Sequence, residues 1–274
     1  MKRSGIVFAQ SRNARIKNTF ISRRISMIST IPFRTSLIAA GFGAILLLHP
    51  AASVHSQKAD AFKFQHAVSR SADTARILAL LAVAPETDLP KEIADRAEAI
   101  GVFPKVVKET VMFNSFSKGY GVISARTEHG WTLPAFYSFQ GGGYGNPFAN
   151  TETYAVLLFF MTGDSLKWFE KGGVELTNRQ KALEGPIKTV TDDQRKELAD
   201  AHILAYAYYN GKLNGTSFGK SFWKSFALNP DNNINSPVYG VKGREVLAGA
   251  KIDPANVLSG IPEYQATLVK YYGR

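Results

Sequence analysis

The spacing of hydrophobic residues predicts helices near the start of the chain. Apolar side chains recur every three or four residues from 61 to 84, which is the period of an amphipathic helix. Leu89-Pro90 opens a second predicted helix over residues 91–100, and Gly101 is placed to end it.

The pattern then changes to short β-like runs separated by glycine turns. Residues 106–116 and 120–126 are rich in β-branched and aromatic residues, and Glu128-His129-Gly130 is a predicted hairpin turn. From 131 to 139, large residues alternate with smaller or more polar neighbours, as in a half-buried strand. Residues 154–161 are apolar on both faces, which indicates a central strand.

The second half of the chain mixes both patterns. Residues 203–209 form a predicted strand, and residues 212–226 are its predicted hairpin partner across Asn210-Gly211. Asp164 is expected to cap a short helix. Further helices are predicted over residues 164–171, 192–199, 241–250 and 257–272.

This order of elements predicts an α+β fold. Helices at the ends and meandering strands between them indicate an antiparallel β-sheet or a barrel-like core with flanking N-terminal and C-terminal helices. No linker or repeat interrupts residues 57–274, so we assign them to a single domain.

The first 56 residues have the layout of a signal peptide. An uncharged apolar run, LIAAGFGAILLL over residues 37–48, follows Arg34 and leads into small residues. The run is shorter than the roughly 20 apolar residues of a transmembrane helix. We predict cleavage after Ser53 or Ser56, so that the mature protein begins between Val54 and Gln57, and export to the periplasm or cell envelope of a bacterium. Translation from Met27 would give a compact leader. The alternatives are a twin-arginine signal around Arg23 and Arg24, a mitochondrial presequence, an uncleaved membrane anchor and a structural helix of the domain.

The charge distribution argues against a nucleic-acid partner. The 274-residue chain carries a formal charge of +11, but no acidic residue precedes Asp60. Residues 58–274 hold 25 basic against 22 acidic residues, which is close to balance. A large basic footprint for nucleic acid is therefore not expected in the domain.

The chemistry-bearing residues do not form a recognisable catalytic set. The absence of cysteine excludes disulfides, thiol catalysis and thiolate zinc sites, and no G-x-S-x-G motif is present. The one carboxylate–histidine cluster consists of Asp192, Asp193, Glu197 and His202. Asp193 and Glu197 share a helical face that suits a hard cation, but Arg195 and Lys196 interleave them, which favours a solvated, ion-paired face. We predict no enzyme activity, no metal and no cofactor.

A glycine run offers a weak anion site. Gly141, Gly142 and Gly143 are expected in a loop whose exposed amides could cradle an anion. The run lacks the Lys-Ser/Thr ending of a phosphate loop. A sharp loop or strand bend, with positive-φ freedom at Gly143, is the alternative.

The first predicted helix of the domain has the composition of a membrane-binding segment. It combines positive charge with aromatic side chains that can insert into a bilayer. Asp60 and Asp73 weaken its polar face, so docking of the helix on the sheet is the alternative. The predicted lipid-binding residues are Lys58, Phe62, Lys63, Phe64, Arg70 and Arg76.

An ordered set of short motifs resembles a known family over residues 93–249. The motifs are Ala97–Pro104, Gly119–Val122 with Ala125-Arg126, Trp131–Pro134, Gly141–Gly143, Gly185-Pro186, Gly211–Gly215 and Asn235–Gly240. Together they resemble the SYLF domain, also called the Ysc84 actin-binding or DUF500 family. Asn114–Lys118 departs from that family, which usually has a glycine and serine run there.

The resemblance implies a function that the residues alone do not. It implies an exported bacterial member of a family whose eukaryotic members bind phosphoinositides and actin, with lipid binding attributed to the sequence before the domain core. We therefore expect a noncatalytic, membrane-associated domain that binds anionic phospholipid or a phosphoinositide-like lipid; actin binding is implied by the resemblance alone. The alternatives are an envelope hydrolase acting on glycan or lipid, and a structural protein-interaction module of the envelope.

Overall fold

The computed structural model describes residues 52–83, 89–144, 150–171, 174–177, 182–188, 190–215 and 225–273. Contacts divide the chain into two compact units, Met1–His49 and Pro50–Arg274, and all described residues belong to the second. Most of the predicted leader therefore lies outside the described residues. Within the described part of the chain, no helix combines the length and apolar character needed to cross a membrane.

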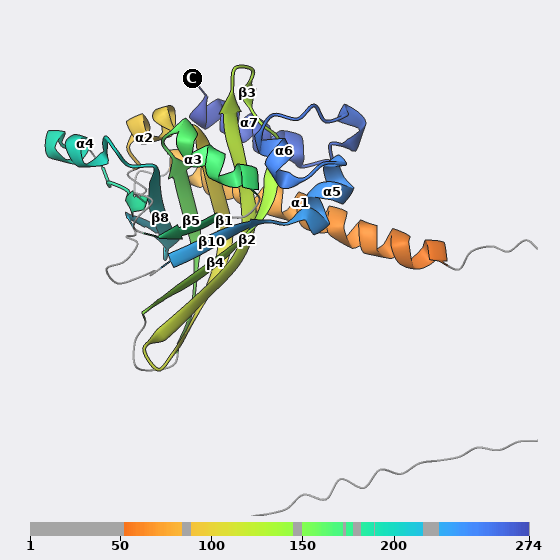
Figure 1. The fold of residues 1–274 in the computed structure, drawn as a ribbon, viewed down its shortest axis with the longest axis horizontal. Helices are drawn as coiled ribbons and strands as arrows, with labels where there is room; N and C mark the ends of the chain where they lie inside the picture. The colour runs from red at the N-terminus through yellow and green to blue at the C-terminus, as the bar shows by residue number, and fades with distance from the viewer. Residues whose placement is uncertain are drawn as a thin grey trace, which may run out of the picture. The chain divides into compact units, whose positions relative to one another are not determined.

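The fold is α+β, as predicted, and its sheet curls into a half-barrel (Figure 1). The strand order is β6-β10-β4-β2-β1-β5-β8-β7, with β3 beside β2 and β9 beside β8. Strands β7 and β8 pair in parallel, and the other pairs are antiparallel. The strands are β1 (Ala99–Val111), β2 (Asn114–Thr127), β3 (Gly130–Trp131), β4 (Ala135–Tyr144), β5 (Asn150–Phe160), β6 (Val174–Thr177), β7 (Ala182–Glu184), β8 (Ile203–Tyr209), β9 (Lys212–Gly215) and β10 (Ser225–Pro230).

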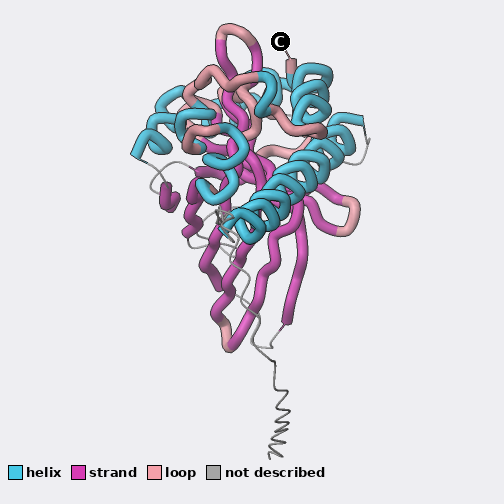
Figure 2. The backbone as a smooth tube through the Cα atoms, turned by 90° about the vertical axis from the view of Figure 1, so that its right-hand side faces the viewer, coloured by secondary structure: helices cyan, strands magenta, loops and turns pink. Residues whose placement is uncertain are grey.

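Helices gather at one end of the sheet, and the strands run beyond them (Figure 2). The longest helix, α1, packs against α5, α7, β1 and β2. It does so because Ala67, Ser71 and Leu78 fall on one stripe of the helix and are fully buried. The helices are α1 (Ala52–Val83), α2 (Lys91–Arg96), α3 (Gly163–Lys167), α4 (Asp192–Leu198), α5 (Asn232–Tyr239), α6 (Gly243–Leu247) and α7 (Ile261–Tyr272), with 3-10 turns at Trp168–Lys171 and Pro254–Asn256.

The central strands change their burial pattern halfway along. In β1, residues 99–103 are all buried, and the residues after Pro104 alternate between buried and exposed. In β2 the order is reversed: residues 114–120 alternate, and residues 121–125 are all buried. One end of the sheet is thus covered on both faces, and at the other end one face is open to solvent. We call this open face the outer face.

A β-bulge separates the two halves of β1. Val102 pairs with Val122, but Lys105 pairs with Tyr120, so β1 gains one residue on β2 across Pro104. Proline has no N–H for the ladder, and a bulge accommodates it. Opposite the bulge, a Cβ on Gly121 would overlap the carbonyl oxygen of Val102, so this close approach requires glycine.

Several predicted elements are corrected by the structure. The helix predicted over 91–100 ends at Arg96, because Ala99 already begins β1. The predicted partner of β8 is only partly right: β9 pairs with β8, whereas β10 pairs with β4 and β6. Helix α5 was not predicted at all. The strand predicted over 203–209 and the turn at 128–130 are confirmed.

Candidate functional site

Two of the predicted lipid-binding residues on α1 face the body of the protein. Phe64 packs against the hydrophobic core. Arg70 forms an ion pair of 2.8 Å with Asp231, and its guanidinium carbon lies 4.6 Å from the centroid of the Tyr120 ring. These contacts tie α1 to α5 and to β2. Phe64 and Arg70 therefore contribute to docking of the helix.

The remaining predicted residues of α1 are less engaged with the core. Phe62 is 63% exposed, and Arg76 is exposed and paired with Asp73 at 3.2 Å. Lys63 is half-buried, and the side chain of Lys58 lies outside the described residues. In α1, Phe62 is thus the predicted insertion residue that remains accessible.

The glycine run lies in a strand, which corrects the expected loop. Gly141 pairs with Ser117 of β2 and Phe226 of β10, and Gly142 also has neighbours on both sides. The amides of Gly141 and Gly142 therefore belong to the ladders of a sheet. Gly143 pairs with β2, and it is not among the glycines with positive φ. At Gly141 and Gly142 the exposed amides on which the anion site depends are therefore not available.

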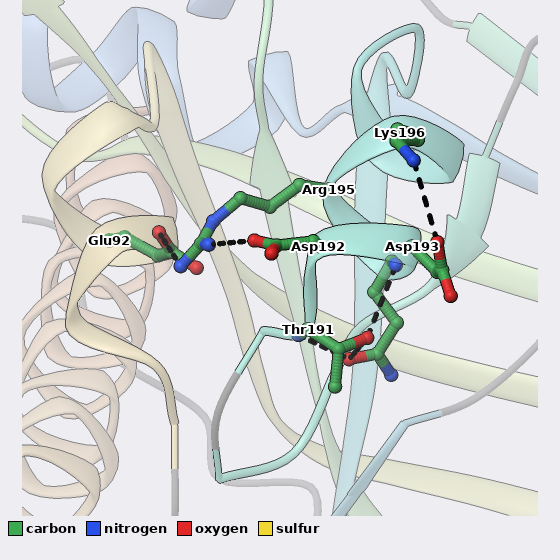
Figure 3. A network of polar contacts seen from close by, with 7 residues as sticks. Glu92, Thr191, Asp192, Asp193, Arg195 and Lys196 are labelled. Carbon is green, nitrogen blue, oxygen red and sulfur yellow. Dashed lines mark hydrogen bonds and ion pairs between the residues drawn. The ribbon is translucent and has the colours of Figure 1, made fainter.

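The acidic cluster is an ion-paired surface helix, as the interleaved basic residues indicated (Figure 3). Arg195 pairs with Asp192 at 2.8 Å and with Glu92 of α2 at 3.4 Å, and Lys196 pairs with Asp193 at 3.6 Å. The side chain of Glu197 is outside the described residues. Among those that are described, no group of three histidine or carboxylate side chains is arranged to hold a metal ion.

His202 is separate from this cluster and contacts Thr162 instead. Thr162 caps α3, in place of the predicted Asp164, because its Oγ1 accepts the backbone N–H of Ser165. The same oxygen lies 2.7 Å from His202 Nδ1, within hydrogen-bond distance. Lys167 donates a hydrogen bond to Asp164 and thereby lowers the pKa of that carboxyl. The Thr162 hydroxyl is accounted for as a helix cap.

Sequence reasoning missed an unusual surface among the described residues, the turn between β1 and β2. Val111 pairs with Asn114, so Met112 and Phe113 form a two-residue turn. Both have positive φ, at 45° and 68°. A two-residue hairpin with positive φ at both positions favours Asn-Gly, because bulky side chains are disfavoured in that conformation.

The same turn exposes its large apolar side chains. Met112 is 75% exposed and Phe113 is 61% exposed, and Val111 and Phe116 beside them are also mostly exposed. We call Val111, Met112, Phe113 and Phe116 the hairpin end. It lies where the strands extend away from the helices (Figures 1 and 2).

Charged residues follow the hairpin end on the outer face. Lys105 and Lys118 are exposed, and Lys118 Nζ lies 5.8 Å from the centroid of the Tyr120 ring. Glu109 is exposed beside Phe116, its partner in register. Lys108 points to the opposite face, where it is buried and pairs with Glu152 at 3.4 Å. Near the turn the outer face thus carries the apolar side chains together with Glu109, and Lys118 and Lys105 lie farther from the turn.

Comparisons with protein-family models, curated proteins and solved structures find no match to this chain. The resemblance to the SYLF domain therefore stays a prediction from the residues, and the surface at the hairpin end is interpreted by its physical chemistry.

Proposed function

We propose that this protein binds membranes without catalysing a reaction and that the hairpin end inserts into the bilayer. The observation that carries the proposal is the pair Met112 and Phe113, two large apolar residues that are exposed in a turn whose backbone disfavours them. Local energetics do not explain their presence, so we attribute it to function.

The energetics favour transfer of this turn to an apolar environment. A left-handed backbone costs about 1–2 kcal/mol for each such residue, and exposure of Met112 and Phe113 to water adds to the cost. Full burial of each apolar side chain contributes about 1.5–3 kcal/mol, less at a membrane interface. Insertion of several side chains of the hairpin end thus supplies several kcal/mol.

The order of residues along β2 suits shallow insertion. Phe113 lies in the turn, and Phe116 is the third residue of β2, in which each residue advances roughly 3.3 Å along the strand. Lys118 follows two residues later, at the height expected for headgroups when the aromatic residues reach the acyl chains. Shallow insertion also keeps most strand backbone out of the hydrocarbon region, where unpaired polar groups are costly.

The proposal keeps the predicted class of function and moves its site. Helix α1 was the expected insertion segment, but Phe64 and Arg70 are engaged with the body of the protein. Export to a bacterial envelope, predicted from the leader, is part of the proposal because it would bring the domain to a membrane surface. The resemblance to the SYLF domain supports lipid as the partner.

Vesicle sedimentation with two matched variants tests the proposal. Phe113→Ser and Phe62→Ser remove the same side chain from positions of similar exposure, 61% and 63%. With vesicles of phosphatidylcholine and phosphatidylglycerol, we expect Phe113→Ser to weaken binding roughly tenfold, which corresponds to about 1.4 kcal/mol. Phe62→Ser should bind as the natural chain does. The reverse pattern would assign insertion to α1, and equal binding by all three proteins would contradict insertion of the hairpin end.

A further inference from the structure

Phe116 and Lys118 form a ridge on the outer face with a hollow on each side. The hollow over β2, β4 and β10 has a volume of about 430 Å³, and the residues that line its open side are Phe116, Lys118, Gln140, Gly142, Ser225 and Ala227. The hollow over β1 and β2 is bordered by Lys105, Glu109 and Tyr120. The first hollow lies beside the glycine run, which the proposed function does not use.

Glycine creates this first hollow. In register, Phe116 of β2, Gly142 of β4 and Ser225 of β10 form one row across the sheet. A Cβ built on Gly142 would meet no atom within 4 Å. Bare backbone therefore lies between a large aromatic side chain and a small polar one, and the result is a furrow beside Phe116.

The furrow has an apolar part and a charged part. Phe116 and Gly142 lie nearer the hairpin end, and the next row, farther from the turn, holds Lys118, Gln140 and Ala227. An amphiphile whose chain lies beside Phe116 can place a negatively charged headgroup at Lys118. The hollow over β1 and β2 suits such a ligand less well, because Glu109 borders it.

We propose that the furrow beside Phe116 binds one acyl chain of a phospholipid, with the lipid phosphate at Lys118. The inference rests on the proposed function, because it takes the hairpin end to lie in the bilayer. In that orientation the acyl chain points toward the turn and the phosphate points away from it, which is the direction of a lipid in the leaflet. The acyl chain then contacts the sheet face on one side and the neighbouring lipids of the bilayer on the other.

Calorimetric titration with dodecyl phosphate below its critical micelle concentration tests the furrow without a bilayer. We expect saturable binding to the natural chain and at least a tenfold loss with Gly142→Leu, which fills the furrow. Inorganic phosphate should give no measurable binding, because the alkyl chain of the probe makes most of the contact with the furrow. Gly163→Leu is the matched control, since Gly163 also has open space around its Cβ position and should leave binding unchanged.

Several results would overturn the furrow. The natural protein could fail to bind dodecyl phosphate, or a folded Gly142→Leu variant could bind it as tightly as the natural protein does. Binding of maltose in place of the alkyl probe would indicate a sugar site. A melting temperature for each variant establishes that it is folded.

The variants also separate the furrow from the proposed function. Phe113→Ser should bind vesicles more weakly, as above, and keep dodecyl phosphate binding, because Phe113 is not among the residues that line the furrow. If the natural protein binds dodecyl phosphate but does not bind vesicles, the result would support the furrow and contradict membrane insertion. Vesicle binding without dodecyl phosphate binding would support insertion and contradict the furrow.

Discussion

Arg70 of α1 and Asp231 at the start of α5 form an ion pair of 2.8 Å across 161 positions of the chain. Their side chains are only 16% and 14% exposed. The pair links α1 to α5, and the Arg70 guanidinium also lies over the Tyr120 ring of β2. A basic residue that the sequence assigned to a membrane surface thus has a structural partner.

Arg70→Ala should lower the free energy of unfolding by about 3 kcal/mol, because the Asp231 carboxylate would be left largely buried without its partner. Arg76→Ala is the control, since the Arg76–Asp73 pair is exposed and is worth at most about 1 kcal/mol. Urea unfolding of both variants measures the difference. A stability loss no larger for Arg70→Ala than for Arg76→Ala would show that the pair does not fasten α1.

Glycines of the central sheet should differ sharply in their tolerance of a methyl group. Gly121→Ala should cost about 1–3 kcal/mol, because the new Cβ meets the Val102 carbonyl at the bulge. Gly142→Ala should be neutral or stabilising, because its Cβ enters open space in a strand. Melting temperatures of the two variants test the register of β1, β2 and β4. Equal effects would contradict the bulge.

Alkaline pH should unfold the protein as its buried tyrosines ionise. Burial raises the pKa of Tyr137, Tyr206, Tyr239, Tyr264 and Tyr272 well above the usual value of about 10. Because the folded-state pKa exceeds the unfolded-state one, this contribution to stability is fully present below pH of about 10 and is lost as the pH rises above it. Tyrosinate absorbance from these residues should appear together with loss of circular dichroism. Complete ionisation with an intact spectrum would contradict their burial.

Local patterns predicted most elements because local forces form them. Strand β8 was predicted with its observed bounds, since its apolar run ends at Asn210-Gly211, where both residues have positive φ. The β1–β2 turn was missed for the converse reason. Phe113 is a strand-forming residue type and Met112 is not a turn residue, so the pattern runs through them as a continuous strand over 106–116.

Long-range pairing decides what the sequence could not. Whether α1 inserts in a membrane or docks on the sheet depends on the partner of Arg70, and Asp231 is too distant in the chain to be inferred. The glycine run reads as a loop by composition, but pairing with β2 and β10 makes it strand. The residues of the candidate site could therefore be identified only once the register of the sheet was known.

Met112 and Phe113 should lower the free energy of unfolding of the protein while they strengthen membrane binding. The double variant Met112→Asn/Phe113→Gly supplies the residues that this backbone favours, so we expect the free energy of unfolding to rise by about 1 kcal/mol or more. Thermal or urea unfolding measures the change. A less stable variant would mean that Met112 and Phe113 contribute to folding rather than strain it.

Vesicle sedimentation of this same double variant tests membrane insertion most directly, because it removes both apolar side chains while keeping the hairpin. If Met112 and Phe113 insert, the variant should be at least as stable as the natural chain and should stay in solution when vesicles of phosphatidylcholine and phosphatidylglycerol are sedimented. Undiminished sedimentation of the folded variant with those vesicles would contradict insertion of the hairpin end.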